Sequence, residues 1–193
     1  GGLEEVDDRV RAKGGTATLV PVDLMDFDKI DQLGQSIFER FGRLDILVGN
    51  AAMLGDLSPV SHYAPKTWEK VFALNVTANY RLIRSLDRLL RGSDAGRAMF
   101  VTSGVARSPV AYFGAYAASK AALEMMVRMY AREVALSPLK VNLLDPGVVR
   151  TKMRAHGFPG EDPMIHPAPE EITDRFVELA EPACQVHGEV VSV

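Results

Sequence analysis

This chain of 193 residues has one cysteine, no long hydrophobic run and no large excess of either charge. Its single cysteine, Cys184, cannot form a disulfide within the chain. No apolar run approaches the length that crosses a bilayer, and the first five residues have neither the basic nor the apolar region of a signal peptide. For the sequence as it stands, these absences predict a cytoplasmic location.

Neither sign of charge dominates, because 22 Lys and Arg residues face 25 Asp and Glu residues. The chain therefore lacks the electrostatic footprint of a protein that binds nucleic acid or an anionic membrane. Its four histidines, His62, His156, His166 and His187, show no paired spacing, and no Cys, His and acidic cluster resembles a metal site. We expect no nucleic acid, membrane or metal among its partners.

The order of apolar segments predicts an α/β fold. One core is the expectation for a chain of this length, so we predict a single domain over residues 1–193. Runs of Val, Ile and Leu without alternation indicate buried parallel strands over residues 17–22, 44–49, 98–102, 139–144 and 188–193. Helical spacing covers residues 3–13, 26–42, 65–91, a segment from Tyr116 to about residue 137, and 170–180. Strands that alternate with helices predict a doubly wound parallel sheet between helix layers.

Polar or small residues stand directly after most of the predicted strands. Ligands of doubly wound sheets bind outside the carboxyl ends of the strands. The residues at those positions are Asp23, Asn50, Ala51, Ala52, Ser103, Pro146 and Gly147. Tyr116 and Lys120 open the helix after the third strand, so we expect all of these residues at one rim of the sheet.

Tyr116 and Lys120 are four residues apart, which places them on one face of a helix. A neighbouring cation favours the phenolate and lowers the tyrosine pKa from its ordinary value of about 10. A tyrosine tuned in this way can act as a general acid or base. Such a pair also arises by chance, so its weight depends on the residues predicted to surround it.

Taken with Asn75, these motifs resemble the classical short-chain dehydrogenase/reductase family in order and spacing, from about Gly2 to Val193. The resemblance implies a Rossmann-like, three-layer fold and an oxidoreductase that transfers hydride between NAD or NADP and a carbonyl or alcohol. It implies that Tyr116 exchanges the hydroxyl proton and that Ser103 hydrogen-bonds the substrate oxygen. Lys120 would lower the tyrosine pKa and hold the nicotinamide ribose, and Asn75 would bind a water that links Lys120 to solvent. Ser103 could instead be a turn residue, and Asn75 a satisfied core amide.

The resemblance also implies where the cofactor and substrate would bind. The expected cofactor residues are Asp23, Leu24, Asn50, Ala51, Ala52, Tyr116, Lys120, Pro146, Gly147, Val149 and Thr151. Asp23 would meet the adenine amino group, or would only begin a turn or cap the following helix. Thr151 would contact the nicotinamide carboxamide. Val105, Phe113 and Met153 would shape the substrate pocket, with residues 150–169 as a loop beside it. These side chains are mostly apolar, which favours a ketone of some hydrophobic character.

A glycine-rich turn between a first strand and a first helix is the family motif that the sequence lacks. We therefore expect an N-terminally incomplete fold, without its first strand, first helix and second strand, or roughly 30 to 45 residues by the size of a βαβ unit. A stable fragment that no longer binds cofactor is the alternative. Other open functions are a non-catalytic nucleotide-binding or scaffold protein and an epimerase or lyase. The two long helices favour a homodimer or homotetramer.

Overall fold

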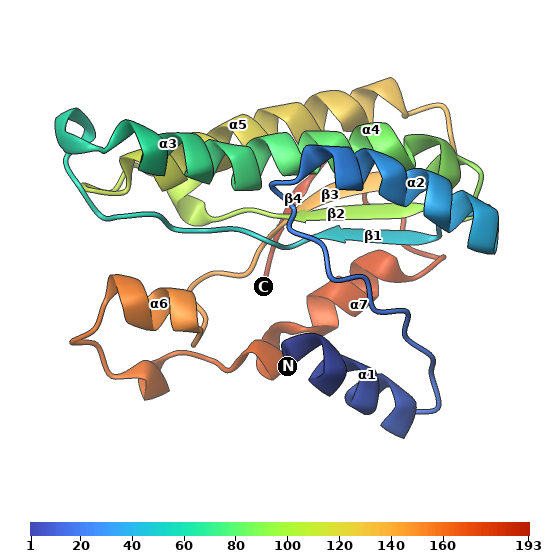
Figure 1. Ribbon diagram of the computed structural model, residues 1–193, viewed down its shortest axis with the longest axis horizontal. Coiled ribbons are helices and arrows are strands. Elements are labelled where there is room, and N and C mark those ends of the chain that lie inside the picture. The colour runs from blue at the N-terminus through green and yellow to red at the C-terminus, as the bar shows by residue number, and fades with distance from the viewer.

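The computed structural model describes residues 1–193 and places one parallel sheet between two layers of helices (Figure 1). Its strands are β1 (Ile46–Gly49), β2 (Arg97–Val101), β3 (Lys140–Asp145) and β4 (Val190–Ser192). They lie in the order β1-β2-β3-β4, and each pairs with its neighbour in parallel. The predicted doubly wound α/β class is confirmed, as are four of the five predicted strands.

The helices divide between the two faces of the sheet (Figure 1). One face is covered by α2 (Phe27–Phe41), α3 (Pro65–Phe72), α4 (Ala78–Arg91) and α5 (Gly114–Glu133). On the other side lie α1 (Gly2–Ala12), α6 (Lys152–Gly157) and α7 (Asp174–Ala180). None of these helices is both long enough and apolar enough to cross a membrane.

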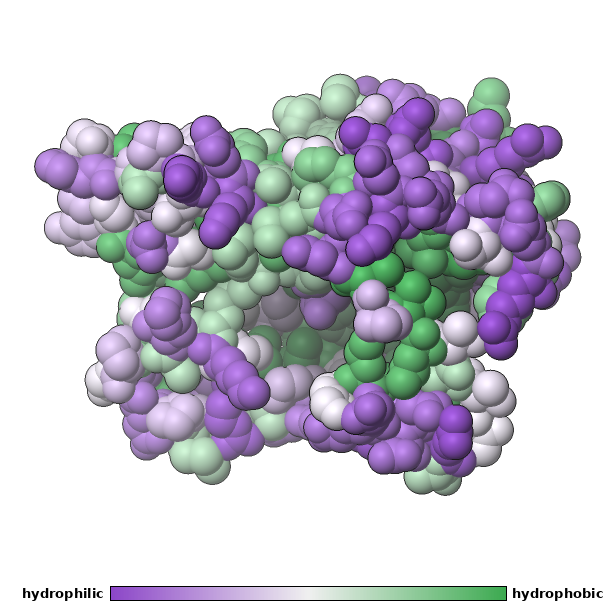
Figure 2. Space-filling model, in the orientation of Figure 1, coloured by the Kyte–Doolittle hydropathy of each residue, from purple (hydrophilic) through white to green (hydrophobic).

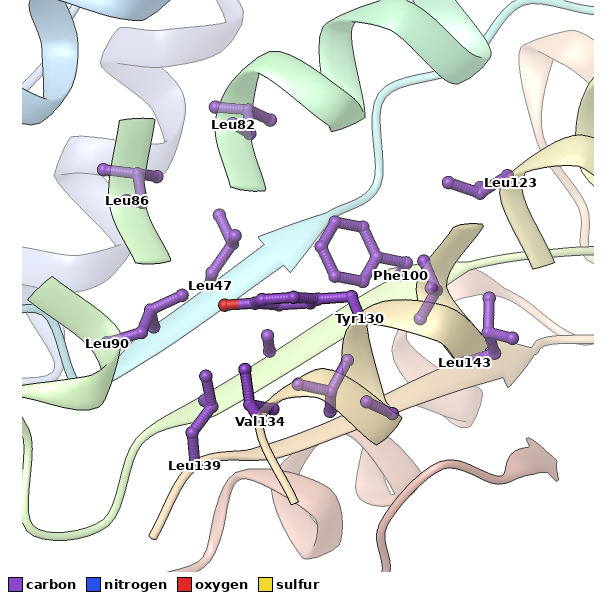
Figure 3. Packing of buried hydrophobic residues seen from close by; sticks show 14 of the residues in the cluster. Leu47, Leu82, Leu86, Leu90, Phe100, Leu123, Tyr130, Val134, Leu139 and Leu143 are labelled. Carbon is purple, nitrogen blue, oxygen red and sulfur yellow. The ribbon is translucent and has the colours of Figure 1, made fainter. Parts of the chain in front are cut away.

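The main hydrophobic core fills the space between the sheet and helices α4 and α5 (Figure 3). Phe100 and Leu143 enter it from the sheet, Leu86 from α4 and Leu123 from α5, and each is buried. Burial of one such side chain stabilises a fold by about 1.5–3 kcal/mol. A smaller cluster, built on Met99, Leu144 and Leu179, joins α7 to the opposite face. Several buried residues of α5 belong to the larger core, which holds this helix against the sheet.

Helices α2 and α4 approach each other closely at Gly34. The Gly34 N–H donates to Ser85 Oγ at 3.0 Å, and that hydroxyl donates to the Ile30 carbonyl, also at 3.0 Å. A Cβ at Gly34 would lie 2.4 Å from the Ser85 carbonyl oxygen, nearer than a Cβ atom packs against an oxygen. The residue must therefore be glycine for this contact to form.

The strand predicted over residues 17–22 is wrong, because these residues run as irregular chain ahead of α2. A strand is stable only where a neighbour pairs its N–H and C=O groups, and no strand of the sheet pairs with this segment. Strand β1 is an edge, and Ile46 and Val48 on it are 45% and 43% exposed. Figure 2 shows hydrophobic side chains gathered in the region where Figure 1 draws β1 and the segment before α2.

Two other predicted segments differ in detail. The helix predicted over residues 65–91 is continuous, but a π-helical turn, Ala73–Thr77, separates α3 from α4. The segment 150–169, predicted as a loop, contains α6 and a 3₁₀ turn, Pro163–Ile165. Thr151 caps the start of α6, where its side-chain oxygen accepts a hydrogen bond from the Arg154 N–H at 3.2 Å. The sequence does not predict this helix, because the segment lacks the apolar periodicity on which the helix predictions rely.

Candidate active site

A cavity of about 590 Å³ opens where β1, β2 and β3 end. Its walls come from these strand ends and from α5, α6 and the segments around them. The lining residues are Asn50, Ala51, Ala52, Leu54, Val101, Thr102, Ser103, Val105, Val110, Phe113, Tyr116, Lys120, Pro146, Gly147, Val148, Val149, Thr151, Met153, Arg154 and Phe158. Of the residues expected at the site from the sequence, all but Asp23, Leu24 and Asn75 line this one cavity.

Tyr116 and Ser103 form the polar centre of the cavity. Tyr116 lies in the first turn of α5, and Ser103 lies two residues after the end of β2. Burial raises the pKa of Tyr116 above its ordinary value, a hydrogen bond with Ser103 opposes that rise, and the negative charge of Asp145 adds to it. The structure therefore corrects the expectation that the pKa is lowered, since desolvation outweighs the hydrogen bond with Ser103.

Lys120 lies one helical turn beyond Tyr116 and is almost fully buried. Its Nζ donates to the Val101 carbonyl at 2.7 Å and lies 5.7 Å from the centre of the Tyr116 ring. Burial lowers the pKa of Lys120 to about 8. A lysine with this pKa can exchange its proton close to neutral pH, which an exposed lysine cannot do.

Asn75 is fully buried behind the cavity, at the centre of the π-helical turn between α3 and α4. Its Nδ2 donates to the Met53 carbonyl at 3.0 Å and to Ser119 Oγ at 2.9 Å, while its Oδ1 accepts from the Met53 N–H at 2.9 Å. The side chain thus connects the segment after β1 to α5. Turns of this π-helical kind are frequent at functional sites. The water contact expected for Asn75 stays a prediction.

The turn after β3 is held by its own first residue. Asp145 Oδ1 accepts from the Gly147 N–H at 3.1 Å, and Gly147 has a φ of +65°, which glycine adopts without strain. This turn carries Pro146 and Gly147 to the cavity and leads on to Val149 and Thr151. The Asp145 side chain and Gly147 thus define the path of the backbone at this rim.

Asp23 and Leu24 do not line the cavity. Asp23 is exposed and accepts a hydrogen bond from the Met25 N–H at 2.9 Å, which matches the turn alternative. Leu24 packs against the main core. A contact between this segment and an adenine stays a prediction.

The apolar wall contains a stack that the sequence did not reveal. Phe113 stacks on Phe158 with ring centres 6.0 Å apart, and the Arg154 guanidinium lies 3.6 Å over the Phe158 ring. Arg154 also donates to both carboxylate oxygens of Glu161, each at 2.6 Å. Val105, Phe113 and Met153 do lie in the same cavity as Tyr116. The four-residue spacing of Arg154 and Phe158 could have predicted that these two side chains contact each other.

The sequence pattern of the family described as short chain dehydrogenase matches residues 1–162. The chain belongs to this family. Among curated members, the uncharacterized oxidoreductase YciK of Escherichia coli K12 is 41% identical over 152 residues, which cover 79% of this chain and 60% of YciK. The 3-oxoacyl-acyl-carrier-protein reductase of Synechocystis is 26% identical over 191 residues, or 94% of this chain and 76% of that enzyme.

Solved structures of the family have the same fold. The structure of YciK superposes with a TM-score of 0.91 at 35% identity, covering 98% of this chain and 80% of YciK. A short chain dehydrogenase of Escherichia coli CFT073, solved with NADPH, gives a TM-score of 0.93 at 36% identity. The match covers 98% of this chain and 80% of that protein. By sequence, the chain spans about 60% of the length of the first curated relatives that it matches.

Proposed function

We propose that this protein is an NAD(P)-dependent oxidoreductase that acts on a carbonyl or alcohol. One observation carries the proposal: Ser103, Tyr116 and Lys120 converge on a single cavity beside the ends of β1 and β3. A proton donor, a second hydrogen-bond donor and a buried amine in one cavity are groups that assist the transfer of hydride to a carbonyl. A scaffold protein would have no physical need for them.

The residues present fit the nicotinamide half of a dinucleotide. Asn50, Ala51 and Ala52 on one side and Pro146 through Thr151 on the other form two walls of the cavity, with Lys120 between them. When bound, the nicotinamide supplies or accepts the hydride. Family members from Escherichia coli CFT073 and Shigella flexneri were solved with NADPH and NADP, so NADPH is the first cofactor to test.

Tyr116 is suited to donate a proton to the substrate oxygen. Its raised pKa keeps the phenol protonated at neutral pH, and Ser103 would hydrogen-bond the same oxygen as negative charge develops on it. Lys120 lies beside the ring and has a pKa near 8, so it would hold or return a proton close to Tyr116. In oxidation of an alcohol the same tyrosine would take the proton.

The substrate proposed from the walls is a ketone or secondary alcohol with an apolar body. The cavity wall includes the apolar side chains of Val105, Val110, Phe113, Met153 and Phe158. A cytoplasmic location and assembly into a homodimer or homotetramer stay predictions.

The test is turnover of NADPH with a panel of aliphatic and aromatic ketones, followed by absorbance at 340 nm. Tyr116→Phe should lower kcat/KM by roughly 10²- to 10⁴-fold, the usual contribution of a general acid. Tyr130→Phe is the matched control, because Tyr130 lies on the far part of α5, where its hydroxyl donates to Asp87 of α4 and does not line the cavity. Unchanged turnover in Tyr116→Phe would refute the proposed role.

The two alternatives give different results in the same assay. A scaffold protein would quench NADPH fluorescence without turnover of any ketone or alcohol. An epimerase or lyase would convert its substrate with no net change at 340 nm.

A further inference from the structure

Three charged side chains meet directly behind the proposed site. Arg107 follows the 3₁₀ turn Gly104–Ala106, Glu124 lies on α5, and Asp145 ends β3. An Arg107 terminal nitrogen donates to Asp145 Oδ2, and its Nε lies 3.7 Å from Glu124 Oε1. The side chains of Glu124 and Asp145 are only 8% and 10% exposed, against 38% for Arg107. The arginine therefore covers two carboxylates that the fold has removed from water.

Each carboxylate also binds a segment that carries a site residue. Glu124 Oε1 accepts from Thr102 Oγ1 at 2.8 Å, and Thr102 immediately precedes Ser103. Asp145 Oδ1 accepts from the Gly147 N–H at 3.1 Å, within the turn at the cavity rim. Arg107 thus connects the Ser103 segment, helix α5 and the turn after β3 through two contacts.

The charges of this cluster reach the proposed acid. Tyr116 faces Lys120 on its own helix and Asp145 at the end of β3, and Arg154 of α6, paired with Glu161, lines the same cavity. The negative charge of Asp145 already raises the pKa of Tyr116. An unpaired buried carboxylate acts more strongly on its neighbours than a paired one, because little solvent screens it.

We propose that Arg107 is a positioning residue of this active site, which fixes the Ser103 segment against α5 and neutralises Asp145 beside Tyr116. This inference rests on the function proposed above, in which Tyr116 and Ser103 act on one substrate oxygen. A merely structural arginine would hold the turn in place, but its loss would leave the titration of Tyr116 unchanged.

The experiment compares wild-type protein with Arg107→Met, Arg107→Lys, Asp145→Asn and the Arg107→Met/Asp145→Asn double variant. Titration of Tyr116 is read from absorbance at 295 nm, after subtraction of the same protein carrying Tyr116→Phe. This readout needs no turnover, so it tests the inference even if the proposed function fails. Circular dichroism and thermal unfolding show that each variant is folded.

The expected result is a rise of about one pH unit in the Tyr116 titration of Arg107→Met, as for an added neighbouring charge. Asp145→Asn should shift it downward, and the double variant should return close to wild type. Arg107→Lys, which keeps the charge, should shift it less than Arg107→Met. Ketone reduction by Arg107→Met should show kcat lowered by roughly 10- to 100-fold, from displacement of Ser103, with KM for NADPH unchanged.

Two outcomes would overturn the inference. One is an Arg107→Met protein that is folded and titrates like wild type. The other is a shift that persists unchanged in the double variant, which would show that Asp145 does not mediate it. If Asp145→Asn is the only variant that folds, its Tyr116 titration decides the electrostatic part: a downward shift supports it, and an unchanged titration overturns it. Wild-type protein without any turnover would instead refute the proposed function.

Discussion

Replacement of Asn75 with alanine should loosen the segment after β1 from helix α5. The side chain is fully buried and makes three hydrogen bonds, two with Met53 and one with Ser119. Each contributes about 0.5–1.5 kcal/mol net, and a buried partner left unpaired costs more. Because Met53 is only partly buried, water can replace some of the loss, and we expect about 2–4 kcal/mol of destabilisation.

Urea unfolding followed by circular dichroism measures this change, and thermal unfolding gives an independent value. For a domain of 150–250 residues, each kcal/mol lowers Tm by about 2–4 °C, so the melting temperature should fall by on the order of 10 °C. NADPH should also bind more weakly, since Ala51 and Ala52 precede Met53 on the same segment. Tyr80→Phe, at an exposed position of α4, is the control and should change stability by less than about 0.5 kcal/mol.

Asn75→Asp separates the hydrogen bonds from packing. It keeps the shape but can present an acceptor oxygen to the Met53 carbonyl, where the amide presented a donor. Protonation at low pH restores a donor, so the destabilisation relative to wild type should be smaller at pH 5 than at pH 8. A destabilisation below about 0.5 kcal/mol in Asn75→Ala, or one independent of pH in Asn75→Asp, would refute the reasoning.

Two further predictions concern pH. Burial lowers the pKa of Lys120 to about 8, so below pH 8 the amine is charged in both states and carries its full burial penalty. As pH rises from 8 to about 10.4 the unfolded chain binds the proton that the folded protein has lost, and wild type should gain about 3 kcal/mol over Lys120→Met in urea unfolding. A constant difference would show that Lys120 keeps its charge. A hydrogen bond from Arg154 holds the pKa of Glu161 at about 2. The stability from this pair is present above about pH 4.5 and is lost as pH falls toward 2. The Tm of wild type should therefore exceed that of Glu161→Gln by less at pH 3 than at pH 6. An equal Tm difference at the two pH values would contradict this prediction.

The sequence predicted the cavity well because strand ends are fixed by topology. In a parallel sheet the residues that follow each strand meet at one edge, and Asn50, Ser103 and Pro146 do so here. The same argument could not locate Asp23, because the segment before it forms no strand in this chain. A run of apolar residues is necessary for a strand, but pairing with a neighbour decides whether the strand forms.

The electrostatics of the site were less predictable than its residues. The four-residue spacing of Tyr116 and Lys120 was read correctly as one helical face, yet the pKa of the tyrosine moves upward because burial depends on the whole fold. Arg107 and Glu124 are far apart in sequence and have no shared motif. The packing of α5 against the 3₁₀ turn Gly104–Ala106 brings them together.

Helix α5 carries Tyr116, Ser119, Lys120 and Glu124 on successive turns and continues into the main core. Helix α6, which brings Met153 and Arg154 to the cavity wall, contains no buried residue and contributes none to either hydrophobic cluster. Substitutions in α6 can therefore reshape the space offered to a substrate at little cost to folding, while those in α5 alter both the chemistry and the fold. Under the function proposed above, substrate range and proton transfer would therefore be determined by separate parts of the chain.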